Sequence, residues 1–174
     1  MGSVLTQTGA VYCRLGETRR GLAEIRRGLE LWRKASSQLQ MSYYLSDFAD
    51  CLLRAHEHDE ADRVLCEAEQ IVAETDERSH MGELLRLRGL LTALNGNVVD
   101  GTTKLWHAVK WARTRNARLF ELRALCELAG GRFLSAKALR RRRHFRRSQL
   151  GFPIRWKRLI SAKQEAYSKN IENA

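Results

Sequence analysis

Apolar residues recur at spacings of three and four along the first three quarters of the chain, a pattern typical of helices that bury one face. Leu22, Ile25, Leu29 and Trp32 form one such stripe. The pattern predicts seven helices, over residues 3–15, 18–34, 39–55, 59–75, 79–94, 98–114 and 117–129. Short polar stretches separate these segments, and no proline before Pro153 interrupts them. The sequence therefore predicts an all-α fold of antiparallel helices.

A second regularity links positions forty residues apart. Leu5, Leu45, Leu85 and Leu125 share one phase, and small residues occupy others. These small positions are Gly9, Ala49, Gly89 and Ala129; Gly21, Ala61 and Gly101; and Gly28, Ala68 and Ala108. A fixed period of this size is typical of an α-solenoid, in which stacked helix pairs share one core. We expect about three repeats plus one helix over residues 1–129, with the small residues where helices approach closely.

Helix starts are expected at short polar side chains. Asp59 and Ser79 precede apolar periodic segments, and each carries an oxygen that can accept a free backbone N–H of the first helical turn. We therefore predict both residues as N-caps.

The repeat resembles part of a known family of signalling proteins. The segments GLAEIRRGLELW at 21–32, ELLRLRG at 83–89 and FELRA at 120–124 are similar to helices in the C-terminal region of bacterial class III adenylate/guanylate cyclase–ATPase proteins. Similar tails occur in ATPase-type transcriptional activators. The resemblance covers roughly residues 10–129 and implies a tetratricopeptide-like fold with units longer than usual. It also implies a scaffold or sensor region of a longer cytoplasmic protein.

The resemblance does not extend to catalytic domains. The chain contains no phosphate-binding loop of the form GxxxxGK[ST], and the metal-binding aspartates of the cyclases have no counterpart in it. No nucleophile-elbow sequence brings Ser, His and Asp together either. We expect no enzyme activity and no cofactor in this chain.

Few residues suggest other chemistry. His56, His58, Asp59 and Glu60 include metal-ligating types, but they fall in a predicted tight turn, where polar residues are common. His107 lies on a predicted helix and is interpreted as structural. We expect no metal site.

The cysteines and aromatic residues lie within the predicted helices. The cysteines are Cys13, Cys51, Cys66 and Cys126, with no CxxC pair, and are interpreted as small buried hydrophobic residues. The aromatic set is Trp32, Trp106, Trp111, Tyr43 and Tyr44. Aromatic residues at helical spacing favour a core role, and a binding groove is the alternative.

Charge divides the chain sharply near residue 130. Residues 1–129 hold 18 Lys/Arg and 18 Asp/Glu, whereas residues 130–174 hold 13 and 2, which accounts for the whole net charge of +11. No apolar run is long enough for a transmembrane segment. Residues 130–174 are thus expected to form a separate basic tail, partly helical or disordered.

Three interpretations of the tail remain open. The first is nucleic-acid binding, because arginines interleaved with aromatic residues can contact phosphates and stack on bases. Its candidate contacts are Arg140, Arg141, Arg142, Arg143, Arg146, Arg147, Arg155, Lys157 and Arg158. An anionic membrane surface would also attract these side chains. The second is a solvated, partly helical arm without a ligand. The third is a frameshifted ending, since the repeat and the charge balance are both lost near Ala129.

The preferred hypothesis for the whole chain is a non-catalytic protein-interaction or regulatory scaffold in the cytoplasm, a fragment of a longer signalling protein. Its partner is an unknown protein or other domains of that parent. The first helices of the pairs are expected to line the partner-binding surface, as in other solenoids.

Overall fold

A computed structural model describes residues 1–34 and 40–130. The chain divides into two units, Met1–Phe133 and Leu134–Ala174, and only the first contains described residues. Every regular element in the described residues is an α-helix. The all-α prediction is therefore confirmed for this part of the chain.

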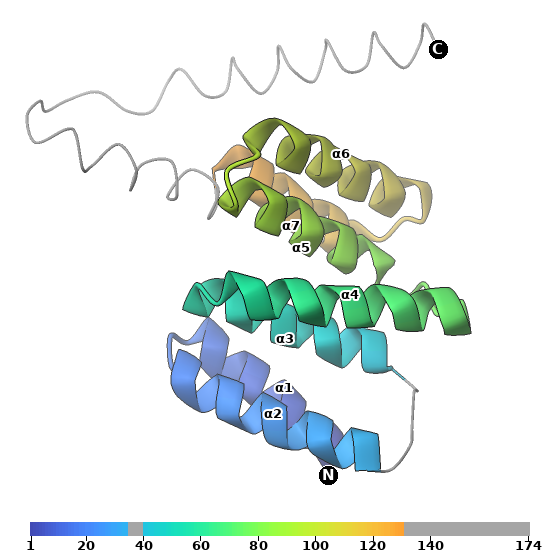
Figure 1. Ribbon diagram of the computed structural model, residues 1–174. Coiled ribbons are helices and arrows are strands. Elements are labelled where there is room, and N and C mark those ends of the chain that lie inside the picture. The colour runs from blue at the N-terminus through green and yellow to red at the C-terminus, as the bar shows by residue number, and fades with distance from the viewer. Residues whose placement is uncertain (35–39, 131–174) are drawn as a thin grey trace, which may run out of the picture. The chain divides into compact units, whose positions relative to one another are not determined.

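Seven helices make up the described unit (Figure 1). They are α1 (Gly2–Arg14), α2 (Thr18–Lys34), α3 (Met41–Ala55), α4 (His58–Thr75), α5 (Met81–Leu94), α6 (Val98–Thr114) and α7 (Arg118–Ala129). Each begins and ends within two residues of its predicted bounds. The polar stretch expected between the predicted helices over 18–34 and 39–55 lies outside the described residues.

The turns contain residues with positive φ at regular intervals. Gly16, His56 and Gly96 lie in the connections between α1 and α2, α3 and α4, and α5 and α6, with φ of 93°, 63° and 104°. Asp76 and Asn116 have φ of 55° and 54° in the connections between α4 and α5 and between α6 and α7. Both sets recur at a spacing of forty residues.

The predicted N-caps are wrong. Helix α4 begins one residue before Asp59, with Glu57 as its N-cap, and α5 begins after His80, one residue beyond Ser79. Neither cap makes a side-chain hydrogen bond to the helix. Asn97 is the residue that does so, since its Oδ1 accepts from the Asp100 backbone N–H at 3.2 Å.

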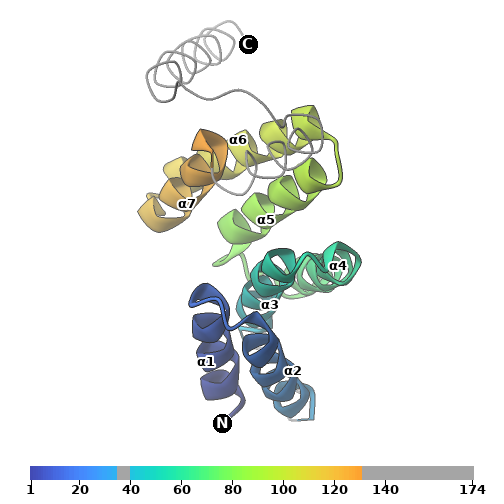
Figure 2. The same ribbon diagram turned by 90° about the vertical axis from the view of Figure 1, so that its left-hand side faces the viewer.

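Helices that follow one another in sequence pack against one another in space (Figures 1 and 2). The closest packing joins α1 to α2, α3 to α4 and α5 to α6. The odd-numbered helices also contact in succession, α1 with α3, α3 with α5 and α5 with α7. We call these four helices the odd row.

Glycines allow the closest approaches, as predicted. A Cβ on Gly9 of α1 would lie 2.5 Å from the backbone oxygen of Gly21 on α2, and one on Gly21 would lie 2.6 Å from the oxygen of Gly9. Gly89 and Gly101 repeat this contact between α5 and α6, with 3.1 and 2.7 Å. Side chains there would push the paired helices apart.

The main core lies between α1 and α5. Ile25, Leu45, Leu52, Leu65 and Leu87 are completely buried in it. A smaller cluster joins α6 to α7. Helix α3 is the most enclosed element, with 12 of its 15 residues buried.

Candidate functional site

A buried arginine lies at the centre of the odd row. The side chain of Arg86 on α5 is 2% exposed. Its Nη2 donates to Glu83 Oε1 at 2.6 Å and to Asp50 Oδ1 on α3 at 3.0 Å, and its Nη1 donates to Glu127 Oε1 on α7 at 2.7 Å. One guanidinium therefore joins three helices of the row.

The electrostatics of this group favour a permanent cation. Burial lowers the pKa of Arg86, but Glu83, Asp50 and Glu127 outweigh burial and raise the pKa above its ordinary value. A guanidinium with three carboxylate partners exchanges no proton at any physiological pH. Arg86 thus braces the row and takes no part in acid–base chemistry.

Further ion pairs extend this network along the odd row. They are Arg54 Nε with Asp50 Oδ2 at 2.9 Å, Arg123 Nη2 with Glu83 Oε1 at 3.1 Å, and Arg14 Nη2 with Asp47 Oδ1 at 2.7 Å. Together with the Arg86 contacts they connect α1, α3, α5 and α7. These contacts pair four arginines with four carboxylates.

Asp47 lies at the α1–α3 junction of this network. Burial raises its pKa, while the Arg14 guanidinium and a hydrogen bond from the Tyr43 hydroxyl oppose that rise. Burial also raises the pKa of Tyr43, and the neighbouring Asp47 carboxylate adds to it. The phenol therefore stays protonated and donates to the carboxylate.

Aromatic rings follow the odd row beside these charges. Successive ring centroids lie 5.2, 5.2, 4.6 and 5.8 Å apart along Trp32, Tyr44, Tyr43, His80 and Phe120. We call this set the aromatic row. Tyr44 is buried, and the other four are half-buried. Burial lowers the pKa of His80, so its ring is mainly neutral at neutral pH.

The partly exposed side chains of this region form a surface for contact with another molecule. Half-exposed Tyr43, His80, Phe120 and Arg123 lie beside charges that are already paired. Among residues 1–34 and 40–130, no group of His, Cys, Asp or Glu has the geometry to hold a metal ion.

Sequence reasoning missed the Arg86 network. Arg86 is separated from Asp50 by 36 residues and from Glu127 by 41, so no local motif connects them. The available signal was a charge between Leu85 and Leu87, within an apolar stripe. An interior charge of this kind requires a partner from a neighbouring helix.

The tight turn predicted to contain His56, His58, Asp59 and Glu60 is shorter than expected, because α4 begins at His58 and contains the last three of these residues. His56 is exposed at the end of α3, and its ring centroid lies 6.2 Å from that of His58 at the start of α4. Neither belongs to a group that could hold a metal among the described residues. His107 is exposed on α6.

The interpretation of the cysteines is correct for two of four. Cys13 and Cys51 are buried, whereas Cys66 and Cys126 are exposed. Cys66 lies on α4, where Nη2 of Arg88 on α5 approaches its sulfur at 3.3 Å. Of the predicted core aromatics, Tyr44 is fully buried, and Trp32, Tyr43, Trp106 and Trp111 are half-buried.

The nine predicted nucleic-acid contacts, Arg140 to Arg143, Arg146, Arg147, Arg155, Lys157 and Arg158, lie outside the described residues. The ending interpreted as frameshifted also lies outside them, from residue 131 onward.

No protein-family model, curated protein or solved structure matches this chain. None of the described helices is long and apolar enough to cross a membrane.

Proposed function

We propose that the helical unit is a non-catalytic protein-interaction scaffold, built as a tetratricopeptide-like α-solenoid. The succession of contacts along the odd row carries the proposal, because each odd-numbered helix touches the next odd-numbered helix as well as its own partner. The positive-φ turns at Gly16, His56 and Gly96 support a repeating unit of about forty residues. Arrays of such units bind partners along one extended surface.

The partner surface is the exposed edge of the aromatic row. Tyr43, His80 and Phe120 are held in place by ring contacts of 4.6 and 5.8 Å, and Arg123 is fixed by Glu83. Tyrosine and arginine side chains that lose little entropy on binding are typical of interaction hot spots. The braced network beneath supplies this rigidity.

The larger setting follows from the resemblance of the repeat sequence. We propose that the scaffold serves a longer cytoplasmic signalling protein of the cyclase–ATPase type. Its partner is then another domain of that protein or a protein that regulates it. The paired state of the charges near Arg86 supports a structural role for them and no catalytic one.

Site-specific photocrosslinking in cells tests this surface. A photoreactive phenylalanine analogue at Phe120 is expected to yield discrete protein adducts of defined mass. The matched control places the analogue at Glu30, an exposed position on α2. Adducts from both positions alike, or from neither, would contradict the assigned surface.

A second candidate function rests on the charge partition. The entire +11 excess lies in residues 130–174, so nucleic-acid binding would be confined to the tail. Binding of a labelled single-stranded oligonucleotide should then weaken steeply as salt rises and disappear when residues 132–158 are deleted. Full-length protein without affinity at low salt would exclude this candidate.

A further inference from the structure

The α5–α6 helix pair contains a pocket that the described side chains leave open. Its volume is about 400 Å³, and it is lined by Leu85 of α5 and by His107, Lys110, Trp111 and Thr114 of α6. We call it the α5–α6 pocket. Leu85 and Trp111 are half-buried and form its apolar part, whereas the other three side chains are exposed. Small-molecule binding sites have volumes of about 300–1,000 Å³, a range that includes this pocket.

The equivalent place in the preceding helix pair is closed. Leu45, the counterpart on α3 of the pocket's leucine, is completely buried. Beside it, Arg33 of α2 binds Glu67 of α4 at 2.8 Å. The positions forty residues later are Ala73 and His107, which cannot form this ion pair. The sequence thus lacks, at the α5–α6 pocket, the charged side chains that bridge the place forty residues earlier.

Trp111 is held in place by its neighbours within the unit. A Cβ on Gly82 of α5 would lie 3.0 Å from the Trp111 ring, so the indole packs directly on this glycine. The Arg115 guanidinium lies 4.4 Å from the centroid of the same ring. An aromatic surface that is already fixed loses little conformational freedom when a ligand binds. The apolar part of the pocket is therefore preorganised.

The charge around the pocket is positive. Of the five lining side chains, Lys110 is a cation, His107 becomes one when protonated, and none is acidic. Lys104 on the same helix is bound to the Asp100 carboxylate, whereas Lys110 forms no ion pair with a described carboxylate. The nearby Arg115 guanidinium adds a second cation. An unpaired ammonium beside an apolar surface suits a ligand that combines an apolar group with an anion.

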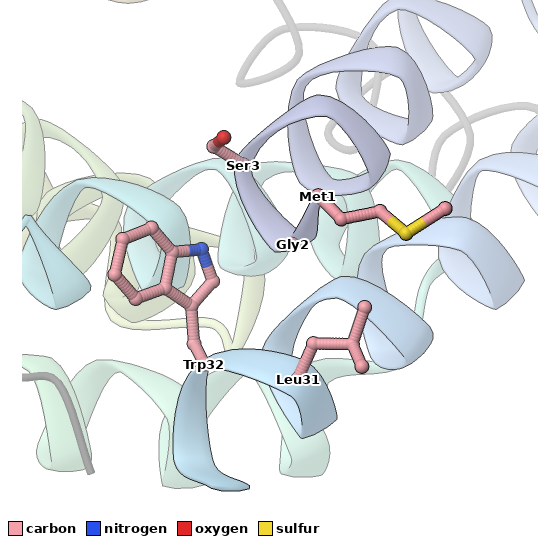
Figure 3. A pocket seen from close by; sticks show the side chains of 5 residues that line it. All are labelled: Met1, Gly2, Ser3, Leu31 and Trp32. Carbon is pink, nitrogen blue, oxygen red and sulfur yellow. The ribbon is translucent and has the colours of Figure 1, made fainter. Parts of the chain in front are cut away.

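A second pocket of similar size differs in charge. Met1, Gly2, Ser3, Leu31 and Trp32 line a space of about 380 Å³ between the start of α1 and the end of α2. Figure 3 shows Trp32 and Leu31 rising from α2 below Met1. None of its lining side chains is charged, so apolar contact dominates there. The two pockets therefore separate the effect of charge from the effect of apolar surface.

We propose that the α5–α6 pocket binds a small aromatic carboxylate. The ring lies against Leu85 and Trp111, and the carboxylate pairs with the Lys110 ammonium. Aromatic rings pair favourably with an indole, which favours an aromatic ligand over an aliphatic one. A protein partner fits less well, because five lining residues are far fewer than the roughly 20–30 residues on each side of a standard protein interface.

This ligand site goes beyond the scaffold function and does not depend on it, because no residue of the aromatic row lines the α5–α6 pocket. Exposure of Lys110 sets the expected strength of binding. An ion pair with an exposed lysine contributes little, and the ligand is small. We therefore expect a dissociation constant on the order of 0.1–1 mM.

Two-dimensional NMR of the side-chain N–H groups of the four tryptophans in the full chain tests the proposal. Trp111→Phe identifies the Trp111 signal. Titration with naphthoate should shift this signal to saturation and leave the Trp32 signal unchanged. Naphthylmethylamine, which carries a cation on the same ring system, should bind more weakly by about threefold or more. Absence of a saturable Trp111 shift, or equal affinity for the two probes, would overturn the proposal.

Reversing the lysine charge sharpens the test. Lys110→Glu should invert the order of the two probes, since the new carboxylate repels naphthoate and attracts the amine. Lys104→Glu is the matched control, because Lys104 is on the same helix and does not line the pocket. Circular dichroism verifies that both variants fold, and the two probes on the unmodified chain need neither variant. Equal effects of both variants would contradict the role of Lys110.

An acidic peptide with one phenylalanine between glutamates distinguishes a protein partner from a small ligand. It carries the same chemistry on a longer chain, so it should shift the Trp111 signal only at higher concentration than naphthoate does. A peptide that shifts the signal at lower concentration, in a way that Lys110→Glu abolishes, would assign the pocket to a protein partner and overturn the small ligand.

Discussion

Helices α1 and α3 occupy equivalent places in their helix pairs but differ in how much of their surface is covered. In α3, 12 of 15 residues are buried, whereas in α1 only Thr6, Gly9, Ala10 and Cys13 are. Both carry an apolar stripe on the same side. The difference arises because α3 has helices before and after it, while the described residues place neighbours of α1 only on the α2 and α3 sides. An apolar stripe thus predicts a packing face, but neighbouring helices decide whether it is buried.

The largest difference between α3 and α1 is expected when a side chain is truncated at equivalent positions of their apolar stripes. Tyr44→Ala in α3 is expected to lower the free energy of unfolding by about 3–5 kcal/mol, because a buried aromatic ring leaves a cavity. Val4→Ala at the equivalent position of α1 should change it by less than about 0.5 kcal/mol, since Val4 is 63% exposed. Urea unfolding measures both. Similar losses for the two variants would contradict the exposure of the Val4 side of α1.

The arginines of the odd row extend the comparison to charge. Arg86→Met should destabilise the fold by about 3–5 kcal/mol, because buried Glu83 loses its main cation. Arg14→Met on α1 should cost about 1 kcal/mol or less, since the Arg14 side chain is 44% exposed. Thermal unfolding of the two variants gives the ranking. An Arg86→Met protein as stable as the parent would contradict a bracing role for the network.

Helices α1 and α3 also differ in the residue at their contact with the next helix, which is Gly9 in α1 and Ala49 in α3. Gly9→Ala in α1 should destabilise by about 1–3 kcal/mol despite the better helix propensity of alanine, because the new Cβ meets the Gly21 backbone. Ala49→Gly, at the equivalent position of α3, should cost about 1–2 kcal/mol, because glycine has a lower helix propensity and the completely buried Ala49 methyl is lost from the core. Chemical denaturation measures both losses of stability. A stabilised Gly9→Ala variant would mean that α1 and α2 pack less closely than described.

The smallest expected effect concerns pH. Burial lowers the folded-state pKa of His80, partly opposed by Glu77, Asp47 and Glu83, so the unfolded chain binds the proton more readily. The stability contributed by this neutral ring is complete above about pH 6.5 and is lost as the pH falls from there towards the folded-state pKa. His80→Phe retains the ring contacts and should flatten this part of the stability profile. An unchanged slope between pH 7 and pH 5 would contradict the assignment.

The helices were predicted well because apolar residues recur every three to four positions and polar breaks recur at a spacing of about forty residues, and both patterns are visible in a single sequence. The stripe with Leu22 and Ile25 fixed the face of α2, and the phase of Gly9, Gly89 and Gly101 correctly marked close contacts. These features depend on local spacing. Helix starts were predicted less accurately. Asp59 and Ser79 have suitable side chains but are not the N-caps, whereas Asn97 accepts the cap hydrogen bond.

The candidate site was largely unpredictable from one sequence. Arg86 finds Asp50 and Glu127 only through the stacking of α3, α5 and α7. The exposure of Cys66 and Cys126 also depends on which neighbours each helix has. Contacts between helices distant in the sequence require the three-dimensional arrangement, and the charge pattern along the chain does not specify the pairing.

Hydrogen exchange of backbone amides tests most directly whether neighbouring helices decide how well α1 and α3 are protected. Amides in residues 2–14 should exchange faster than those in residues 41–55, because four residues of α1 are buried against 12 of 15 in α3. Exchange in α1 as slow as in α3 would contradict the account.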